Sequence, residues 1–246
     1  MNNIFSQAKL ALSVAELQQL PLDSQAEVAF AGRSNAGKSS AINAITNRRR
    51  LAFVARQPGK TRLIQLFQLL PGRFIVDLPG YGYARVGEAT KRRWGQLVDG
   101  YLRSRDVLKG LILIMDVRHP LTPLDRHLLE WFLPRRLPVH ILLTKADKLS
   151  SSRREAALLQ FRHLLVAEGL ICSAQLFSSH SRTGVEEAQA VVAGWLGFQS
   201  SSGKAATTNK NPRLKGSKAG GESALIEIKA PAQGGEAGDD ETSSAK

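Results

Sequence analysis

The sequence predicts an α/β fold: a three-layer, mostly parallel six-stranded sheet with one antiparallel edge strand. Strand-like apolar segments alternate with helical stretches along most of the chain, which is typical of a sheet covered by helices on both faces. Two of these segments are separated only by Pro71-Gly72-Arg73, so we expect them to form an antiparallel hairpin. A loop bounded by glycines joins the first segment to a helix, which suits a sheet that binds its ligand at the carboxyl ends of the strands.

The predicted strands are short apolar runs, and the predicted helices carry apolar residues three or four positions apart. Ile42 and Ile45 indicate a helix directly after the glycine-bounded loop. The same spacing is plain over residues 158–165 and 185–195. The strands are predicted at residues 27–31, 63–70, 73–78, 110–116, 138–144 and 174–178.

Residues 32–39 form a complete phosphate-binding loop, Gly-Arg-Ser-Asn-Ala-Gly-Lys-Ser. Glycines at both ends let backbone N–H groups wrap a phosphate chain, and the following helix dipole favours an anion. Lys38 can reach the β- and γ-phosphates, and the Ser39 hydroxyl can ligate Mg²⁺. The loop therefore predicts binding of a nucleoside triphosphate. Its nucleotide-binding residues are Gly32, Arg33, Ser34, Asn35, Ala36, Gly37, Lys38, Ser39 and Ser40.

A second motif, Asp77-Leu78-Pro79-Gly80, ends the apolar run 74–76. An aspartate at this strand end can face Mg²⁺ through water, and the Gly80 N–H can meet the γ-phosphate. We assign all four residues, Asp77, Leu78, Pro79 and Gly80, to the nucleotide site.

A threonine that ligates Mg²⁺ only when the γ-phosphate is present should lie between these two motifs. Only Thr46 and Thr61 occur there, and Thr46 lies inside the predicted helix. Thr61 follows the turn residues Gly59 and Lys60, directly before a predicted strand. We assign Gly59, Lys60 and Thr61 to the site, and the alternative is that Thr61 merely enters the strand.

Thr144, Lys145, Ala146 and Asp147 follow another apolar run. The Asp147 carboxylate can accept hydrogen bonds from guanine N1–H and the N2 amino group, and adenine offers neither donor. The Lys145 stem can lie over the purine. Alone, such a Lys-x-Asp is a common surface turn, but its order after the other motifs favours guanine. A fourth segment, Phe177, Ser178 and Ser179, could offer a backbone N–H to guanine O6.

The order of these motifs resembles that of the translation-factor-related GTPases. Residues 29–35, 77–84 and 143–149 are more similar still to the EngB (YihA/YsxC) family of bacterial ribosome-assembly GTPases, in the TrmE-Era-EngA-like superfamily. Residues 81–84, within Gly-Tyr-Gly-Tyr-Ala, belong to the most specific stretch. The resemblance covers about residues 5–197. The departures are Ala41 where a larger aliphatic is usual, Lys60 where arginine is usual, and Ser179 where alanine is commoner.

The resemblance implies a Ras-like P-loop GTPase domain over residues 23–198, after an N-terminal lead-in over 1–22 that is a helix or a strand. It also implies GTP and GDP as ligands, Mg²⁺ as cofactor, the large ribosomal subunit and its rRNA as partner, and a link to cell division and septation. Residues 199–246 are rich in Ser, Gly, Ala and Lys, which predicts a disordered tail. The alternative function is an RNA-binding module with a structural or barely catalytic nucleotide site.

Tyr81 occupies the position where small signalling GTPases carry the glutamine that orients water. We therefore expect slow intrinsic hydrolysis, completed by K⁺, the ribosome or both. Asn35 suggests activation by K⁺, because GTPases with Asn at this loop position resemble those that use K⁺. The alternative is that Asn35 is an ordinary turn residue. The predicted catalytic residues are Lys38, Thr61 and Asn35.

The chain has a formal net charge of +13, and residues 198–246 contribute almost none of it, with seven basic and six acidic side chains. Such a field favours polyphosphate partners. The single cysteine, Cys172, excludes an intrachain disulfide, and no apolar run approaches the ~20 residues of a membrane span. We expect a cytoplasmic monomer without membrane association. The residues expected to face RNA are Arg48, Arg49, Arg50, Lys91, Arg92 and Arg93.

Overall fold

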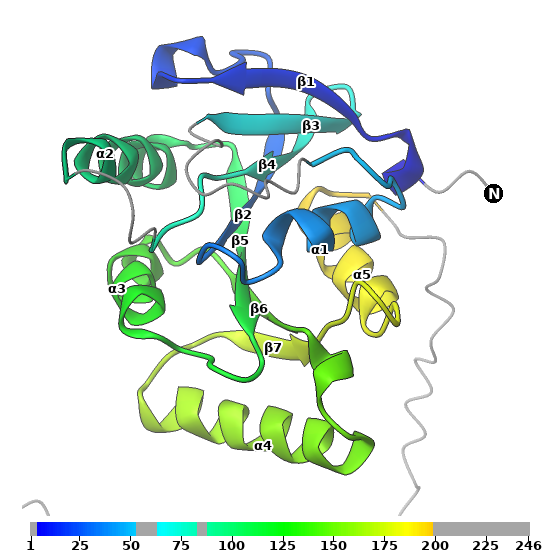
Figure 1. The fold of residues 1–246 in the computed structure, drawn as a ribbon. Helices are drawn as coiled ribbons and strands as arrows, with labels where there is room; N and C mark the ends of the chain where they lie inside the picture. The colour runs from blue at the N-terminus through cyan, green and yellow to red at the C-terminus, as the bar shows by residue number, and fades with distance from the viewer. Residues whose placement is uncertain (1–3, 53–62, 83–87, 199–246) are drawn as a thin grey trace, which may run out of the picture. The chain divides into compact units, whose positions relative to one another are not determined.

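The computed structural model describes residues 4–52, 63–82 and 88–198, and the side chains of 88–94 and 131 are not described. The predictions for Gly59, Lys60, Thr61 and the tail over 199–246 therefore lie outside the described residues. The described sheet has seven strands in the order β1-β3-β4-β2-β5-β6-β7 (Figure 1). Their bounds are β1 Lys9–Val14, β2 Ala26–Gly32, β3 Ile64–Leu70, β4 Arg73–Asp77, β5 Leu108–Asp116, β6 Val139–Thr144 and β7 Ser173–Leu176.

The predicted α/β class is confirmed, because β4, β2, β5, β6 and β7 run parallel and β3 returns antiparallel to β4 through the expected hairpin. The predicted number of strands was six and the structure has seven. The additional strand is Lys9–Val14, which pairs antiparallel with β3. Only Val14 of these six residues is buried, so the strand shows little of the apolar alternation that would reveal it in the sequence.

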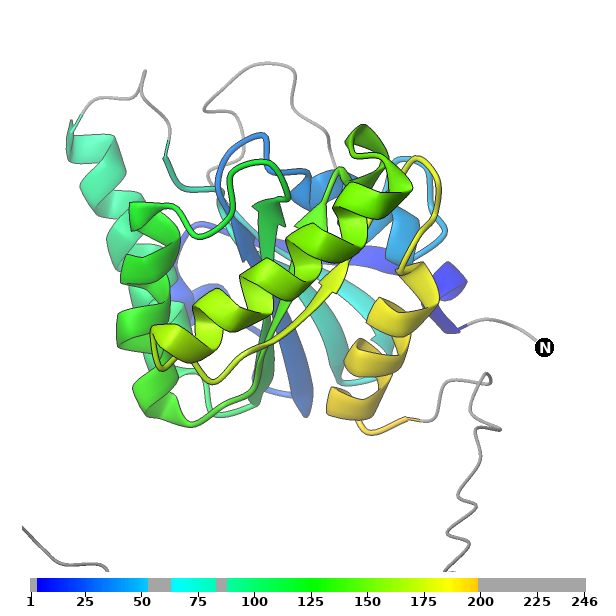
Figure 2. The ribbon, with the colours of Figure 1, turned by 90° about the horizontal axis from the view of Figure 1, so that it is seen from below.

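Helices cover both faces of the sheet, which explains the nearly continuous apolar character of its central strands. Apolar residues of α2, α3 and α4 pack on one face, and those of α1 and α5 pack on the other (Figure 1, Figure 2). Along β5, Leu111 and Leu113 point to the first layer, whereas Ile112 and Ile114 point to the second. The helices are α1 Lys38–Ile45, α2 Glu88–Ser104, α3 Pro123–Phe132, α4 Ser151–Ala167 and α5 Val185–Trp195.

Four 3-10 turns, Ile4–Gln7, Leu17–Gln19, Leu133–Arg135 and Ala146–Lys148, complete the described elements. Within the described residues, no helix is both long and apolar enough to cross a membrane.

A buried ion pair lies at the amino ends of the parallel strands. Glu27 of β2 is fully buried, and its Oε1 lies 2.6 Å from an Arg105 guanidinium nitrogen. The Tyr101 hydroxyl donates to Glu27 Oε2 at 2.6 Å, and Arg105 also donates to the Pro21 carbonyl at 2.7 Å. The network joins the end of α2 to β2, at the opposite end of the strands from the predicted ligand site.

Candidate nucleotide site

The predicted phosphate loop lies between the carboxyl end of β2 and the start of α1, as expected. A Cβ atom on Gly32 would stand 2.7 Å from the Ile114 carbonyl oxygen, so only glycine fits at the entrance of the loop. Gly37 has φ +104° and is the N-cap of α1. This left-handed conformation turns the chain so that the free N–H groups of the first helical turn, from Lys38 onward, face the loop.

Neighbouring segments hold the loop from two sides. Ser34 donates from its backbone N and its Oγ to the Tyr81 carbonyl, at 2.9 and 3.0 Å. On the other side, the Thr144 hydroxyl donates to the Ala36 carbonyl, and Lys145 Nζ donates to the Asn35 carbonyl at 2.7 Å. The shape of the phosphate loop is therefore fixed by two neighbouring segments. One follows the Asp77–Gly80 turn, which the sequence assigned to the γ-phosphate, and the other is the Thr144–Asp147 loop, which it assigned to the base.

Lys38 and Asp77 form an ion pair that joins the phosphate loop to the end of β4. Asp77 is 2 % exposed, and burial raises the pKa of its carboxyl, although the nearby Lys38 ammonium acts in the opposite direction. Ser39 follows Lys38 in the first turn of α1 and is partly exposed. Hydroxyl and carboxylate oxygens are the ligands that Mg²⁺ prefers, so these residues fit the predicted ion. Thr61, the third predicted ligand, lies outside the described residues.

Tyr81 follows the Asp77-Leu78-Pro79-Gly80 turn and ties it to α3. Its hydroxyl donates to Asp125 Oδ1 at 2.5 Å, and the other Asp125 oxygen accepts from the backbone and hydroxyl of Thr122, at the start of α3. Burial raises the pKa of Tyr81 well above its usual value, and Asp125 adds to the effect. The phenol is thus held as a neutral hydrogen-bond donor to α3, which supports the expectation that Tyr81 does not orient water.

The two segments that the sequence assigned to the base contact each other. The backbone N of Ala146 donates to the Phe177 carbonyl at 3.1 Å, which joins the Thr144–Asp147 loop to the loop after β7. The fully buried Ser178 hydroxyl donates to Asp147 Oδ1 at 2.7 Å, and this bond lowers the pKa of the Asp147 carboxyl. Ser179 follows in the same loop. A carboxylate kept ionised and oriented in this way is suited to accept the two guanine donors.

One residue that contacts the candidate site, Asp116, was not singled out by the sequence analysis. Asp116 ends β5, and its Oδ2 lies 2.9 Å from Lys145 Nζ and 2.7 Å from a guanidinium nitrogen of Arg118. Burial alone would raise the pKa of Asp116, but hydrogen bonds from Arg118 and Lys145 lower it. Asp116 therefore orients Lys145 between the base loop and the phosphate loop. An aspartate at the carboxyl end of a buried strand, like Asp77, was the signal that could have revealed it.

The two predicted RNA-facing clusters lie on different elements. Arg48, Arg49 and Arg50 are exposed, but they follow the far end of α1, whose eight residues span about 12 Å from the loop. Arg48 also donates to the Ser6 carbonyl at 3.4 Å. Lys91, Arg92 and Arg93 lie in α2, and their side chains are outside the described set.

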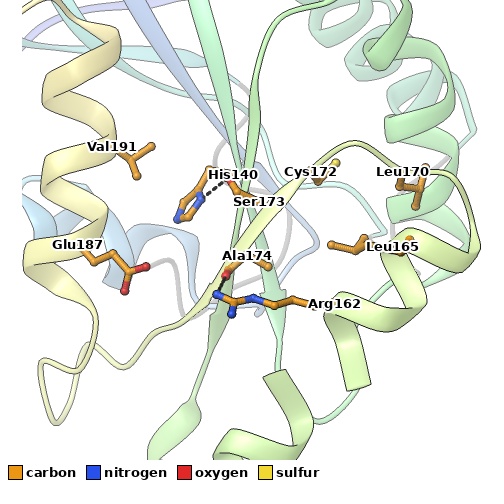
Figure 3. Close-up of a pocket in the computed structure, with 10 residues that line it drawn as sticks. His140, Arg162, Leu165, Leu170, Cys172, Ser173, Ala174, Glu187 and Val191 are labelled. Carbon is orange, nitrogen blue, oxygen red and sulfur yellow. Dashed lines mark hydrogen bonds between the residues drawn. The ribbon is translucent and has the colours of Figure 1, made fainter. Parts of the chain in front are cut away.

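A hollow of about 550 Å³ lies away from this site, between α4, β7 and α5 (Figure 3). His140 and Ser173, which line it, stand at the amino ends of β6 and β7, whereas the nucleotide loops stand at the carboxyl ends. Three of its polar side chains, His140, Ser173 and Arg162, have hydrogen-bond partners. His140 contacts Ser173 and Gln175 at 2.7 and 2.8 Å, and Arg162 donates to the Ala174 carbonyl at 2.8 Å. The hollow is not part of the nucleotide site.

The phosphate loop and the Asp147 carboxylate, set at the same end of the parallel strands, define a P-loop GTPase, an enzyme that binds and hydrolyses GTP. A family model described as a 50S ribosome-binding GTPase matches residues 27–145. The probable GTP-binding protein EngB of Aromatoleum aromaticum is 53% identical over 197 residues, covering 80% of this chain and 91% of the relative. That of Thiobacillus denitrificans is 54% identical over 193 residues, covering 78% and 93%. The chain therefore belongs to the EngB family of GTP-binding proteins, which confirms the resemblance found in the motifs.

Solved structures show the same fold at low sequence identity. A crystal structure of a probable GTP-binding protein engB matches with a TM-score of 0.55 and 19% identity, over 70% of this chain and 98% of that one. Era in complex with MgGDPNP and nucleotides of 16S ribosomal RNA matches with a TM-score of 0.56 and 18% identity, over 70% and 56%. These likenesses support the GTPase architecture alone.

Proposed function

We propose that this GTPase is a nucleotide-controlled assembly factor for the large ribosomal subunit, which binds the subunit in its GTP form and leaves after hydrolysis. The observation that carries the proposal is the match to the family model described as a 50S ribosome-binding GTPase. The match spans residues 27–145, from the strand before the phosphate loop to Lys145 of the base loop. The described nucleotide-binding segments thus fall mostly inside the region that this description concerns.

The charge of the folded part supports a partner rich in phosphate. Nearly all of the formal +13 belongs to the residues before 198. A basic surface of this kind speeds encounter with polyphosphate and binds its backbone in a salt-dependent way. Two clusters are proposed to contact rRNA, Arg48 to Arg50 after α1 and Lys91 to Arg93 in α2.

Nucleotide control requires the triphosphate to be read by residues that GDP cannot engage. We propose that Ser39 and Thr61 ligate Mg²⁺ and that Asp77 acts on the ion through water, while Asp147 holds guanine. When bound, the ion would supply positive charge that offsets the negative charge of the phosphates. Thr61 joins the site only with the γ-phosphate, so the segment around it reports the nucleotide state.

Ribosome assembly also sets the proposed cellular context. The protein acts in the cytoplasm as a monomer, and effects on cell division and septation follow from defective ribosome assembly.

Co-sedimentation with purified large ribosomal subunits tests the proposal. We expect binding with a non-hydrolysable GTP analogue, little binding with GDP, and an affinity that falls steeply as salt rises. Thr61→Ala should retain GDP affinity and lose the binding that depends on the analogue. Charge reversal of Lys91, Arg92 and Arg93 should weaken subunit binding and leave GTP affinity nearly unchanged, and reversal of Arg48, Arg49 and Arg50 is the matched comparison. Subunit binding that ignores the nucleotide would contradict the proposal.

A further inference from the structure

A buried amide oxygen beside the nucleotide site lacks a hydrogen-bond partner. Across residues 4–52, 63–82 and 88–198, the buried side-chain atoms without a partner are Gln65 Oε1 and Ser24 Oγ. Ser24 precedes β2, at the amino end of the sheet. Gln65 is the second residue of β3. A buried acceptor left without a hydrogen bond destabilises a fold, so native structures rarely keep one without a reason.

The position of Gln65 suggests that reason. In the antiparallel register of β3 and β4, Gln65 lies directly opposite Asp77. Directly opposite residues share a face of the sheet, with Cβ atoms roughly 4.5–5.5 Å apart. This is the face covered by α1, because the Asp77 carboxylate pairs with Lys38 of that helix. On its other side Gln65 faces Ser13 of β1, which is exposed.

We propose that Gln65 is a positioning residue for the metal, whose Oε1 accepts a hydrogen bond from a water molecule bound to Mg²⁺ in the nucleotide site. Mg²⁺ keeps several waters when the protein offers few direct ligands. Asp77 and Gln65 present two adjacent acceptors to that hydration shell. Lys38 is not the missing donor, because its ammonium already pairs with Asp77 and is directed to the phosphates when nucleotide binds.

This inference rests on the proposed magnesium site at Ser39 and Asp77, but it is independent of the ribosomal proposal. It predicts that Gln65 lowers the stability of the nucleotide-free protein and strengthens the binding of Mg²⁺. Gln68 offers a matched control, because it is the same residue type on the same strand. It lies three positions along β3 and is partly exposed, with Phe74 as its partner in β4. Residues three apart on a strand point to opposite faces, so Gln68 points away from Asp77.

The test measures release of fluorescent methylanthraniloyl-GDP from the full chain over a range of free Mg²⁺ concentrations. Wild type should release GDP more slowly as Mg²⁺ rises. Gln65→Met keeps the size of the side chain without the acceptor, and it should need roughly five to ten times more Mg²⁺ for the same slowing. Gln65→Glu, which keeps an acceptor oxygen, should need no more Mg²⁺ than wild type. In EDTA all variants should release GDP at the wild-type rate, and Gln68→Met should match wild type throughout.

Thermal unfolding without nucleotide gives a second readout. Removing the unpaired oxygen should raise the Tm of Gln65→Met by about 2–4 °C, whereas a purely structural glutamine would lose stability on the same change. Should Gln65→Met fail to fold, Gln65→Asn withdraws the amide by one methylene and must show the same shift in Mg²⁺ dependence.

Two results distinguish a failure of the proposed magnesium site from a failure of the role of Gln65 alone. A wild-type release rate that ignores Mg²⁺ would overturn the magnesium site and the inference together. A wild type that responds to Mg²⁺ while Gln65→Met behaves identically would overturn the role of Gln65 alone.

Discussion

Two buried ion pairs stand at opposite ends of the parallel strands, and they differ in how completely they are satisfied. At the amino ends, the Glu27 carboxylate accepts from Arg105 and from the Tyr101 hydroxyl, and Arg105 also donates to the Pro21 carbonyl. At the carboxyl ends, Asp77 has a single partner among the described side chains, Lys38.

We interpret the Glu27–Arg105 pair as structural and the Lys38–Asp77 pair as part of the proposed nucleotide site. A buried charge is stable only when hydrogen bonds replace the water that it has lost. Glu27 has such replacements on both oxygens and can remain as it is in every state of the protein. Asp77 has few, and burial raises the pKa of its carboxyl, so its environment improves when a cation and its waters arrive. We propose that a bound cation would complete the hydrogen bonding of the Asp77 carboxylate.

The largest effect on stability should come from breaking the satisfied pair. Glu27→Gln leaves the partly buried Arg105 guanidinium without its carboxylate, and we expect a loss of about 3 kcal/mol, seen as a Tm lower by roughly 6–12 °C. GDP affinity of the folded protein should not change, since the pair lies at the other end of the sheet. Asp99→Asn, which removes an exposed pair with Arg103 on α2, is the control and should move the Tm by no more than about 2 °C.

Lys38→Ala should have the opposite effects, a large loss of nucleotide affinity and a smaller loss of stability. The ammonium contacts phosphates present in both GDP and GTP, so affinity for each should fall roughly 30- to 100-fold in equilibrium binding. The Tm without nucleotide should fall less than in Glu27→Gln, because Asp77, with its raised pKa, can take up a proton when its partner is removed. A Tm loss as large as that of Glu27→Gln would show that Lys38 and Asp77 form a structural pair after all.

Asp147→Asn changes the base that is read. The amide no longer accepts both guanine donors, and it offers a donor to the extra carbonyl of xanthine, so GTP should bind roughly 10- to 100-fold more weakly and xanthosine triphosphate more tightly. Competition binding with the two triphosphates measures the switch. Ser178→Ala, which removes only the bond that orients Asp147, should weaken GTP binding several-fold without the change of base.

The smallest effect concerns Asn35, for which two explanations are open. Its φ of +65° already favours asparagine, which tolerates the left-handed conformation better than most residues. If its side chain also holds K⁺, hydrolysis should be a few-fold faster in K⁺ than in Na⁺ at equal ionic strength, and Asn35→Ala should abolish the difference. Equal rates in both salts, with and without ribosomal subunits, would leave Asn35 as a turn residue only.

The parts of this molecule that the sequence predicted are those defined by short stretches of chain. The phosphate loop, the strand that ends at Asp77 and the Thr144–Asp147 loop each carry their signal within a few residues, because backbone conformation and strand ends are local properties. The sheet register then brings them together at one edge.

The parts that were missed depend on contacts between distant residues. The lead-in that contains β1 was left open as a helix or a strand, because the side chains of β1 mostly face solvent, and the number of strands was one too low. The Asp116–Lys145 pair and the bond from Tyr81 to Asp125 join residues 29 and 44 positions apart. No local pattern fixes such pairs. The unpaired oxygen of Gln65 could not be foreseen either, since a glutamine in a strand gives no sign of which buried neighbours it lacks.

The two bonds that hold the phosphate loop from the base side have an evolutionary consequence. Thr144 and Lys145 donate side-chain hydrogen bonds to the carbonyls of Ala36 and Asn35, whereas Asp147, two positions after Lys145, accepts a hydrogen bond from Ser178. The bonds that hold the phosphate loop and the carboxylate that we propose to hold guanine thus belong to neighbouring but separate side chains. A lineage, or an engineer, could exchange the base that this scaffold accepts by substitution at Asp147 while the phosphate loop retains its inherited shape.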